Sequence, residues 1–313
     1  KTLTVGVYET WLSRGSLEGA ARIAMLLLGL MAFLLLLERY LRVGGIEQKS
    51  KHDQTPVLQK PSPLMQGVVL IISSLPFLIG FMVPVILLIV FVLRSFDNAT
   101  NLLSPAIRSI LLASITAIIV VGIGLFLAFL TRINAPGWFY RSIQTASLGY
   151  AIPGTVLGLG VLIVLSQFDN FSYHVLNLSF LPILSGSVFA MIFAYSLRFL
   201  SISFGTFEAE LSRIPKVTDM AASTLGARTF QLLRLVHLPM LRPALITASV
   251  LVFVDTMKEL PATLILRPFN FETLATQVYN YASLGQIEDA ALPALIIVGV
   301  GIIPVFIATR KLN

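Results

Sequence analysis

Seven long apolar runs divide the chain, and polar segments separate them. The runs lie near residues 19–38, 67–93, 109–131, 143–166, 180–204, 241–262 and 289–309. A helix needs about 20 mainly apolar residues to cross ~30 Å of hydrocarbon, and the runs are of that length. The pattern therefore predicts an all-α integral membrane protein, a polytopic bundle of about seven transmembrane helices.

Composition agrees with the pattern and excludes several kinds of site. Hydrophobic residues make up 56% of the sequence, charged residues make up 12%, and the mean hydropathy is +0.88. These values are too apolar for an ordinary soluble domain. The sequence contains no cysteine, which excludes a disulfide scaffold, a thiolate metal site and a cysteine nucleophile within it.

Basic residues are unevenly distributed among the loops between the predicted spans. The first, third and fifth loops and the C-terminus carry Arg39, Arg42, Lys49, Lys51, Lys60, Arg132, Arg141, Arg198, Arg213, Lys216, Arg228, Arg234, Arg242, Arg310 and Lys311. The other side carries fewer: Lys1, Arg14, Arg22, Arg94, Arg108, Lys258 and Arg267. Because cytoplasmic loops are enriched in Lys and Arg, we expect the N-terminus outside and both the C-terminus and the 205–239 loop in the cytoplasm. This distribution explains the net charge of +7 without a nucleic-acid partner.

A sequence repeat links the two ends of the chain. Thr2-Leu3, Val7-Tyr8, Gly15, Glu18, Ala20-Ala21 and Ala24 recur as Thr273-Leu274, Val278-Tyr279, Gly285, Glu288, Ala290-Ala291 and Ala294. We interpret residues 1–42 as the tail of a first repeat, comprising an external segment and a last transmembrane helix. Residues 65–313 are then a complete second repeat of six transmembrane helices, and the rest of the first repeat would precede Lys1. The alternative is chance similarity between two amphiphilic span entries.

Residues 43–64 lie between the two predicted repeats. They carry Gly44-Gly45, several charged residues, and Pro56, Pro61 and Pro63. Because such a polar stretch cannot pack in lipid, we expect a cytoplasmic linker between the repeats.

The polar segment 218–239 predicts two short helices that meet at a glycine. Thr218 or Asp219 offers an N-cap oxygen for the first helix, and Gly226 supplies the permissive backbone that ends it. A second helix is expected from Thr229, with Phe230, Leu233 and Val236 on one face, and it should stop before Pro239. The result would be a compact knob that projects from the membrane.

The spacing within this segment resembles a known docking motif. Ala221, Ala222, Gly226, Val236, Leu238 and Pro239 fall at the positions of the EAA loop, which is the signature of the permease subunits of ABC importers. The resemblance implies a type I (MetI-like) permease fold, in which the knob docks on a dimer of ATPase subunits. The residues that would carry this contact are Asp219, Ala221, Ala222, Gly226, Phe230, Arg234, Leu238 and Pro239. The sequence departs from the motif at Met220, which stands in place of the Glu, and the acid lies one residue earlier at Asp219. The alternative is a connecting loop whose alanines merely favour helix.

A second stretch, residues 255–276, indicates a cargo. Its Met-Lys-Glu-Leu-Pro-Ala-Thr sequence from Met257 to Thr263 resembles the corresponding segment of ferric-iron permeases. The resemblance implies Fe(III) as the transported cargo and a periplasmic binding protein that delivers it. Permeases for thiamine, spermidine, sulfate or molybdate share the EAA loop and remain alternative classes.

Three ionisable residues within the sixth predicted span are candidates for the substrate pathway, because charge inside a span is costly. Asp255 and Glu259 stand four residues apart, on one face of the expected helix, and their carboxylates suit a hard cation. Lys258 lies between them. The alternative is that Asp255 and Lys258, or an ion pair between helices, fix the packing, so no metal ligand is firmly assigned.

Small residues and a proline interrupt the fourth predicted span. Pro153 is a candidate for a gate or kink on the pathway. Tyr150 and Tyr195 are candidates for hydroxyls that face a pore, although tyrosine in a span more often packs the interior or joins the interfacial belt. The alternative for this region is tight helix packing through Gly154 and Gly158. In the second predicted span, Pro76 and Pro84 predict bends.

Several motifs are missing from the sequence. It has no Gly-x-x-x-x-Gly-Lys-Ser/Thr phosphate loop, so ATP and Mg²⁺ should bind to a separate partner subunit. His52, His174 and His237 share no metal-ligand spacing, and no nucleophile and base pair is recognisable. We therefore expect a non-enzymatic permease of the bacterial inner membrane, completed by the missing N-terminal repeat or by a second permease subunit. Two other classes are the alternatives. An ion-driven secondary transporter would need no docking loop, and a polytopic signalling anchor would need no cargo path.

Overall fold

The structure is a computed structural model that describes residues 2–42, 62–94, 102–133, 136–176 and 184–312. The predicted linker 43–64 lies almost entirely outside the described residues. Within the described part every regular element is helical, which confirms the predicted all-α class. Six of its helices are long and apolar enough to cross a membrane, and a seventh candidate is a helix pair bent by 77°.

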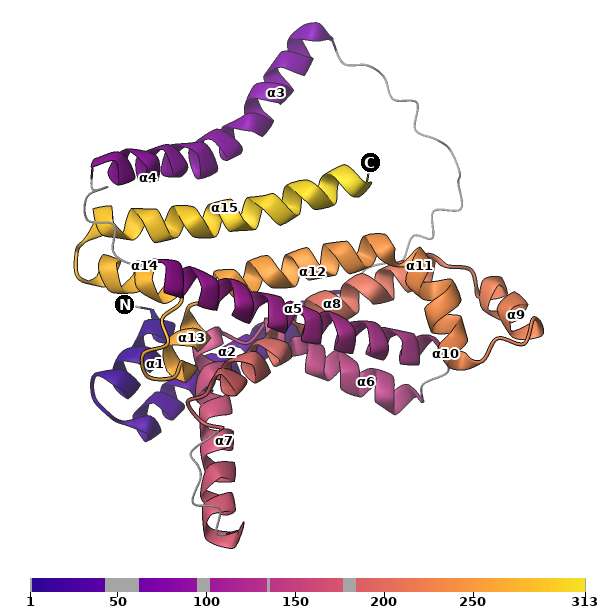
Figure 1. Cartoon of the computed structure of the whole chain (residues 1–313), viewed down its shortest axis with the longest axis horizontal. Helices are drawn as coiled ribbons and strands as arrows, with labels where there is room; N and C mark the ends of the chain where they lie inside the picture. The colour runs from indigo at the N-terminus through magenta and orange to yellow at the C-terminus, as the bar shows by residue number, and fades with distance from the viewer. Residues whose placement is uncertain (1, 43–61, 95–101, 134–135, 177–183, 313) are drawn as a thin grey trace.

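The elements follow one another in a simple order (Figure 1). They are α1 (Leu3–Leu12), α2 (Leu17–Arg42), α3 (Pro63–Phe77), the π-helical η1 (Leu78–Met82), α4 (Val83–Arg94), α5 (Leu103–Arg132), α6 (Gly137–Ala146), the 3₁₀ helix η3 (Ser147–Tyr150), α7 (Gly154–Leu176), α8 (Val188–Arg213), α9 (Lys216–Thr224), α10 (Thr229–Gln231), the π-helical η4 (Leu232–His237), α11 (Leu238–Met240), α12 (Arg242–Met257), α13 (Pro261–Leu266), α14 (Leu274–Ser283) and α15 (Ile287–Leu312).

The axes of the long helices α5, α12 and α15 are roughly aligned, with α12 antiparallel to the other two, and the two ends of this bundle carry different elements (Figure 1). Helices α9 and α10 project from one end, whereas α1 and α14 lie at the other. The largest core cluster joins α5, α7, α8, α12 and α13. Small residues let these helices approach closely: a Cβ atom on Gly124 of α5 would collide with Ser203 of α8.

The outer helices expose apolar surface. No residue in the most apolar stretch of the span Pro63–Arg94 is buried. The exposed side chains along this span include Ile71, Ile72 and Leu87. Apolar surface of this extent fits a lipid environment and not water. The π-helical turn η1 lies between Pro76 and Pro84, and the bend that these two prolines predict is visible between α3 and α4 (Figure 1).

The predicted fourth span, 143–166, is wrong. The helix is interrupted between Tyr150 and Gly154. After the interruption, α7 extends to Leu176 and crosses α5 at a steep angle (Figure 1). Pro153 has no backbone N–H to continue the helix. The break also lies against α8, because a Cβ atom on Gly149 would collide with the carbonyl of Leu197.

The predicted fifth span, 180–204, begins and ends too early. Helix α8 starts at Val188, where the Ser187 hydroxyl accepts a bond from the backbone N–H of Ala190, and it continues to Arg213. Arg198 therefore lies inside α8. Its assignment to the basic residues of the fifth loop was wrong.

The predicted sixth span, 241–262, is shorter than expected. Helix α12 ends at Met257, and α13 begins only at Pro261. Pro261 offers no N–H to an upstream carbonyl, and it stands at the start of α13, where no donor is required. Asp255 and Glu259 consequently do not share one helix face, contrary to the prediction.

Candidate functional site

The segment from α9 to α11, residues 216–240, forms the predicted projection, and we call it the docking knob. Its first helix begins at Lys216, directly after Pro215, and not at an N-cap on Thr218 or Asp219 as predicted. Proline is well tolerated at a helix start because the first N–H groups of a helix have no intrahelical partner. The Asp219 side chain is thereby free for another contact.

Gly226 ends the first helix as predicted. Its φ angle is +84°, in the left-handed region that residues with a Cβ atom adopt at a cost of about 1–2 kcal/mol. The backbone N–H groups of Gly226 and Ala227 donate to the carbonyls of Ser223 and Ala222, which satisfies the end of α9. The knob therefore turns at this glycine.

The second half of the knob differs from the prediction. The helix does not stop before Pro239, because α10 continues through the π-helical η4 into α11, which contains this proline. The wider π turn ends just ahead of Pro239, so the missing N–H falls at the start of the following α-helical turn, where no donor is required. The break comes instead at Leu241, before α12.

Exposed apolar side chains cover the projecting surface of the knob. Met220 is 63% exposed, Leu225 87% and Phe230 70%. Arg228 and Arg234 are also exposed beside them. Exposed apolar residues gathered on a projection and rimmed by polar residues indicate a protein contact. Of the other predicted contact residues, Ala221, Gly226 and Pro239 are exposed, and Ala222 and Leu238 are half-buried.

Asp219 points into the protein, where it meets Arg132 at the end of α5. The Arg132 Nε atom donates to Asp219 Oδ2 at 2.7 Å. The same guanidinium donates to the backbone carbonyls of Leu211, Ile214 and Pro215, which connect α8 to α9. Arg132 is thus a clamp that holds α5, α8 and the knob together, and the Asp219 side chain, 23% exposed, lies against it.

His237 completes this cluster, and sequence reasoning missed it. Its side chain is fully buried, with Nε2 3.2 Å from Asp219 Oδ1 and its ring edge-on to Phe129 at 5.6 Å between centroids. Burial lowers the pKa of His237, and the nearby Arg132 lowers it further although Asp219 opposes both, so the imidazole is neutral at pH 7. The one sequence signal was a lone histidine within an apolar helical stretch.

A second cluster lies inside the bundle, where α7 begins and α12 ends. Arg198 Nε is 3.5 Å from Glu259 Oε2, and the side chains are only 18% and 7% exposed. Glu259 Oε1 also accepts the backbone N–H of Ala262 at 3.2 Å, at the start of α13. Gly154 leaves room for the pair, since a Cβ atom there would collide with both Arg198 and Glu259.

The candidate pathway residues are brought together only in part. Asp255 pairs with Lys258 at 2.7 Å, whereas Glu259 pairs with Arg198, which agrees with the interpretation that ion pairs fix the packing. Among the described residues, no group of three or more histidine, aspartate or glutamate side chains could hold a metal ion. Each of the two carboxylates is therefore paired with a basic side chain of the protein.

The residues around the break in the fourth run have separate environments. Tyr150 is about half exposed at the end of η3, and Pro153 is half-buried directly before Gly154. A Cβ atom on Gly158 would lie 3.2 Å from Ala262 Cα, so tight packing against α13 is observed. Tyr195 is buried and hydrogen-bonded to Thr263, which agrees with a packing role.

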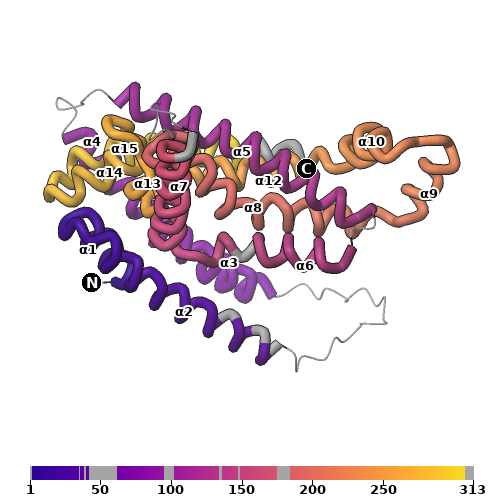
Figure 2. Tube along the Cα trace, turned by 90° about the horizontal axis from the view of Figure 1, so that it is seen from below, coloured from indigo at the N-terminus to yellow at the C-terminus, as the bar shows by residue number. Residues whose placement is uncertain are grey.

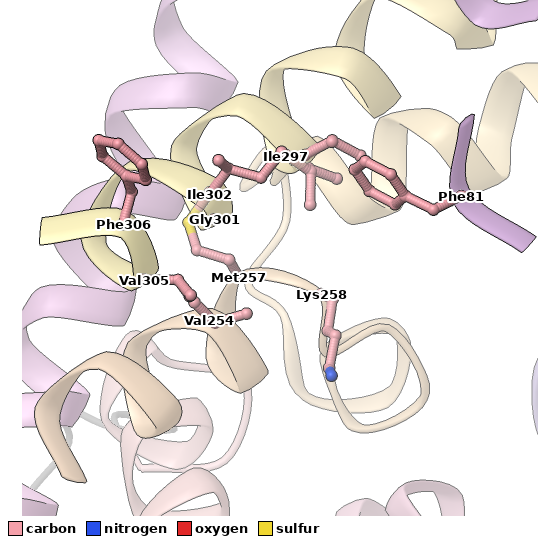
Figure 3. Close-up of a pocket in the computed structure, with 10 residues that line it drawn as sticks. Phe81, Val254, Met257, Lys258, Ile297, Gly301, Ile302, Val305 and Phe306 are labelled. Carbon is pink, nitrogen blue, oxygen red and sulfur yellow. The ribbon is translucent and has the colours of Figure 1, made fainter. Parts of the chain in front are cut away.

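A cavity of about 440 Å³ lies between η1, α12 and α15 (Figure 3). Its walls are apolar side chains such as Phe81, Met257 and Phe306. Lys258 stands at its edge with the ammonium directed away from these walls (Figure 3), toward its partner Asp255. A cavity whose walls are almost entirely apolar, between membrane-spanning helices, suits hydrocarbon and not an ionic cargo.

Comparison with known proteins identifies relatives among ABC permeases. The chain is 28% identical over 243 residues to an Fe(3+)-transport system permease of Haemophilus influenzae, and the match covers 75% of this chain and 45% of that protein. It is 28% identical over 151 residues to a permease of Salmonella paratyphi A named for 2-aminoethylphosphonate transport, covering 48% of this chain and 52% of that protein. The chain thus spans about half the length of these relatives. No family model matches it.

A solved structure has the same fold. A chain of a bacterial alginate ABC transporter, solved with a pentasaccharide-bound periplasmic protein, matches with a TM-score of 0.63 at 15% identity, covering 79% of this chain and 93% of that one. The predicted resemblance to ferric-type ABC importer permeases and the predicted permease fold are both confirmed. With its apolar helices, the chain is a multi-pass membrane protein.

Proposed function

We propose that this chain is the transmembrane permease part of an ATP-driven ABC importer that moves ferric iron from a periplasmic binding protein into the cytoplasm of a bacterium. ATP and Mg²⁺ bind to a separate ATPase subunit, and the chain performs no catalysis itself. It resides in the inner membrane, with its first described residues outside and the docking knob and the C-terminus in the cytoplasm.

The docking knob is the observation that carries this proposal. It combines an exposed apolar surface around Met220 and Phe230 with a buried attachment through Asp219 and Arg132. A rigid projection with an apolar contact surface suits a mechanical joint, because force on the exposed side is transmitted through the clamp to α5 and α8. A secondary transporter or a signalling anchor has no need of this arrangement.

The break between α12 and α13 supports a translocation path near Glu259. Discontinuous helices in transporters line cavities where free backbone groups and helix ends face the cargo. Here the ends of α12, α13 and α7 meet beside the Arg198–Glu259 pair. We infer that this pair borders the path and that the cargo passes it after the outer side opens.

Ferric iron is the first candidate cargo because of the Haemophilus relative and the Met257–Thr263 segment. A phosphonate anion is the second. It is favoured by the Salmonella relative and by the cationic Arg198 side chain inside the bundle.

The uptake of radiolabelled ferric iron tests the proposal. Proteoliposomes that contain the assembled transporter should accumulate iron only with ATP inside and the cognate binding protein outside. Replacement of Gly226 by valine should reduce uptake at least about tenfold, because a β-branched residue is strained at φ +84°. Gly226→Asn is the matched control and should retain most of the uptake, since asparagine tolerates this region.

The same vesicles decide between the two cargoes. If the vesicles accumulated 2-aminoethylphosphonate but no iron, the phosphonate and not ferric iron would be the cargo. Uptake that is independent of ATP, or undiminished in Gly226→Val, would contradict the importer proposal as a whole.

A further inference from the structure

Two segments at opposite ends of the chain fold alike. The side chains of Thr2 and Thr273 cap α1 and α14 by accepting a backbone N–H three residues later. Both helices are followed by a glycine in the left-handed region, Gly15 with φ +63° and Gly285 with φ +77°. These four positions correspond in the sequence repeat.

The similarity continues beyond the glycines. The backbone N–H of Ser16 donates to the Thr10 carbonyl at 3.2 Å, and that of Gln286 donates to the Tyr281 carbonyl at 2.9 Å. The long helices α2 and α15 then begin, and Figure 2 shows them on opposite sides of the molecule. A helix, a glycine turn and a long helix therefore form one unit that occurs twice.

The two units touch through corresponding residues. The rings of Tyr8 and Tyr279 meet edge to face, with centroids 5.9 Å apart and planes at 87°. When two units are related by a two-fold rotation, a residue that contacts its own counterpart lies at the rotation axis. Tyr8 and Tyr279 are counterparts in the sequence repeat, so a two-fold relation between the units would place its axis between them.

The position of this pair in the molecule is also defined. Helices α1 and α14 lie at the end of the bundle opposite to the docking knob (Figure 1). Both tyrosines are half-buried, and Arg267 is paired with Glu272 just before α14. The contact joins two separate helical units by ring edges, an arrangement that can separate without unfolding either unit.

The geometry points to an outer gate: the Tyr8–Tyr279 contact closes the translocation path on the side opposite to the docking knob. The inference rests on the proposed function. In repeats related by an axis along the membrane normal, the cargo path runs between the repeats, so two side chains that meet on the axis obstruct it. Opening requires the α1–α2 unit and the α14–α15 unit to move apart.

Cysteine chemistry tests the gate, because the sequence contains no cysteine. In the assembled transporter, Tyr8→Cys and Tyr279→Cys are combined and joined by a short bifunctional thiol reagent with a reducible link. We expect cross-linking to lower the rate of ATP-driven uptake at least about tenfold. Reduction of the link should restore the original rate. The matched control joins Ser283→Cys to Ile287→Cys, two exposed positions within one unit, and should transport normally.

Spin labels on the same two cysteines provide a second measurement. The distance between positions 8 and 279 should lengthen when ATP binds to the transporter. A cross-linked pair that transports at the rate of the control, or a distance that ATP leaves unchanged, would overturn the gate. Failure of the unmodified transporter to import in the same vesicles would instead refute the proposed function.

Discussion

Replacement of Arg132 by glutamine is expected to uncouple ATP hydrolysis from transport. Arg132 is the residue through which α5 holds Asp219 of the knob and the backbone between α8 and α9. Its side chain is 9% exposed. Loss of one partner from a largely buried ion pair costs about 3–5 kcal/mol, and the partial exposure of Asp219 reduces this toward the lower end. A loosened knob would still bind the ATPase but would no longer transmit its movement.

The quantity to measure is the number of ATP molecules hydrolysed per ion imported. We expect this ratio to rise at least about tenfold in Arg132→Gln, because about 1.4 kcal/mol already changes an equilibrium tenfold. Arg132→Lys should recover little, since lysine cannot reproduce several directed bonds from one planar group. The control is Arg141→Gln, the same change at an exposed arginine of the neighbouring α6. If Arg132→Gln kept the ratio of this control, the clamp would have no part in coupling.

Replacement of Glu259 by glutamine is expected to destabilise the protein strongly. Glutamine keeps the acceptor for the Ala262 N–H but leaves Arg198 as a buried cation without its counter-charge. The expected cost is about 3–5 kcal/mol, measured as a lower melting temperature of the detergent-solubilised protein. The control Glu18→Gln breaks an exposed ion pair with Arg22 and should change the melting temperature little.

A double variant separates packing from transport at this site. Arg198→Met with Glu259→Met removes both charges, and such replacements commonly restore or increase stability. We expect the double variant to melt near the unmodified protein but to import poorly, because the pair borders the proposed path. Normal import by the double variant would limit the pair to a structural role, and a stable Glu259→Gln variant would refute the energetic argument.

Hydrophobic run length predicted the helical class and most spans because crossing lipid demands long apolar helices. It failed near Pro153 and Pro261, where apolar residues continue although the helix breaks. Run length cannot detect such breaks, since the freed backbone groups are satisfied by tertiary neighbours. Pro153 did indicate an interruption of the fourth run, whereas the break before Pro261 was not predicted.

The site was predicted where it depends on local backbone and missed where it depends on distant partners. Gly226 was recognised because a left-handed turn selects glycine. The inward direction of Asp219 depends on Arg132, which is 87 residues away in sequence, and the partner of Glu259 depends on the path of α8. No spacing within one segment reveals such pairs.

The docking of the knob on an ATPase subunit is the central claim, and site-specific cross-linking tests it most directly. Met220→Cys would carry a photoactivatable reagent on the exposed surface of the knob. Phe269→Cys, 95% exposed in the segment between α13 and α14, would carry the same reagent as the control. The account predicts that position 220 captures the ATPase subunit on illumination and that position 269 does not. Capture of the ATPase from position 269, or from neither position, would contradict it.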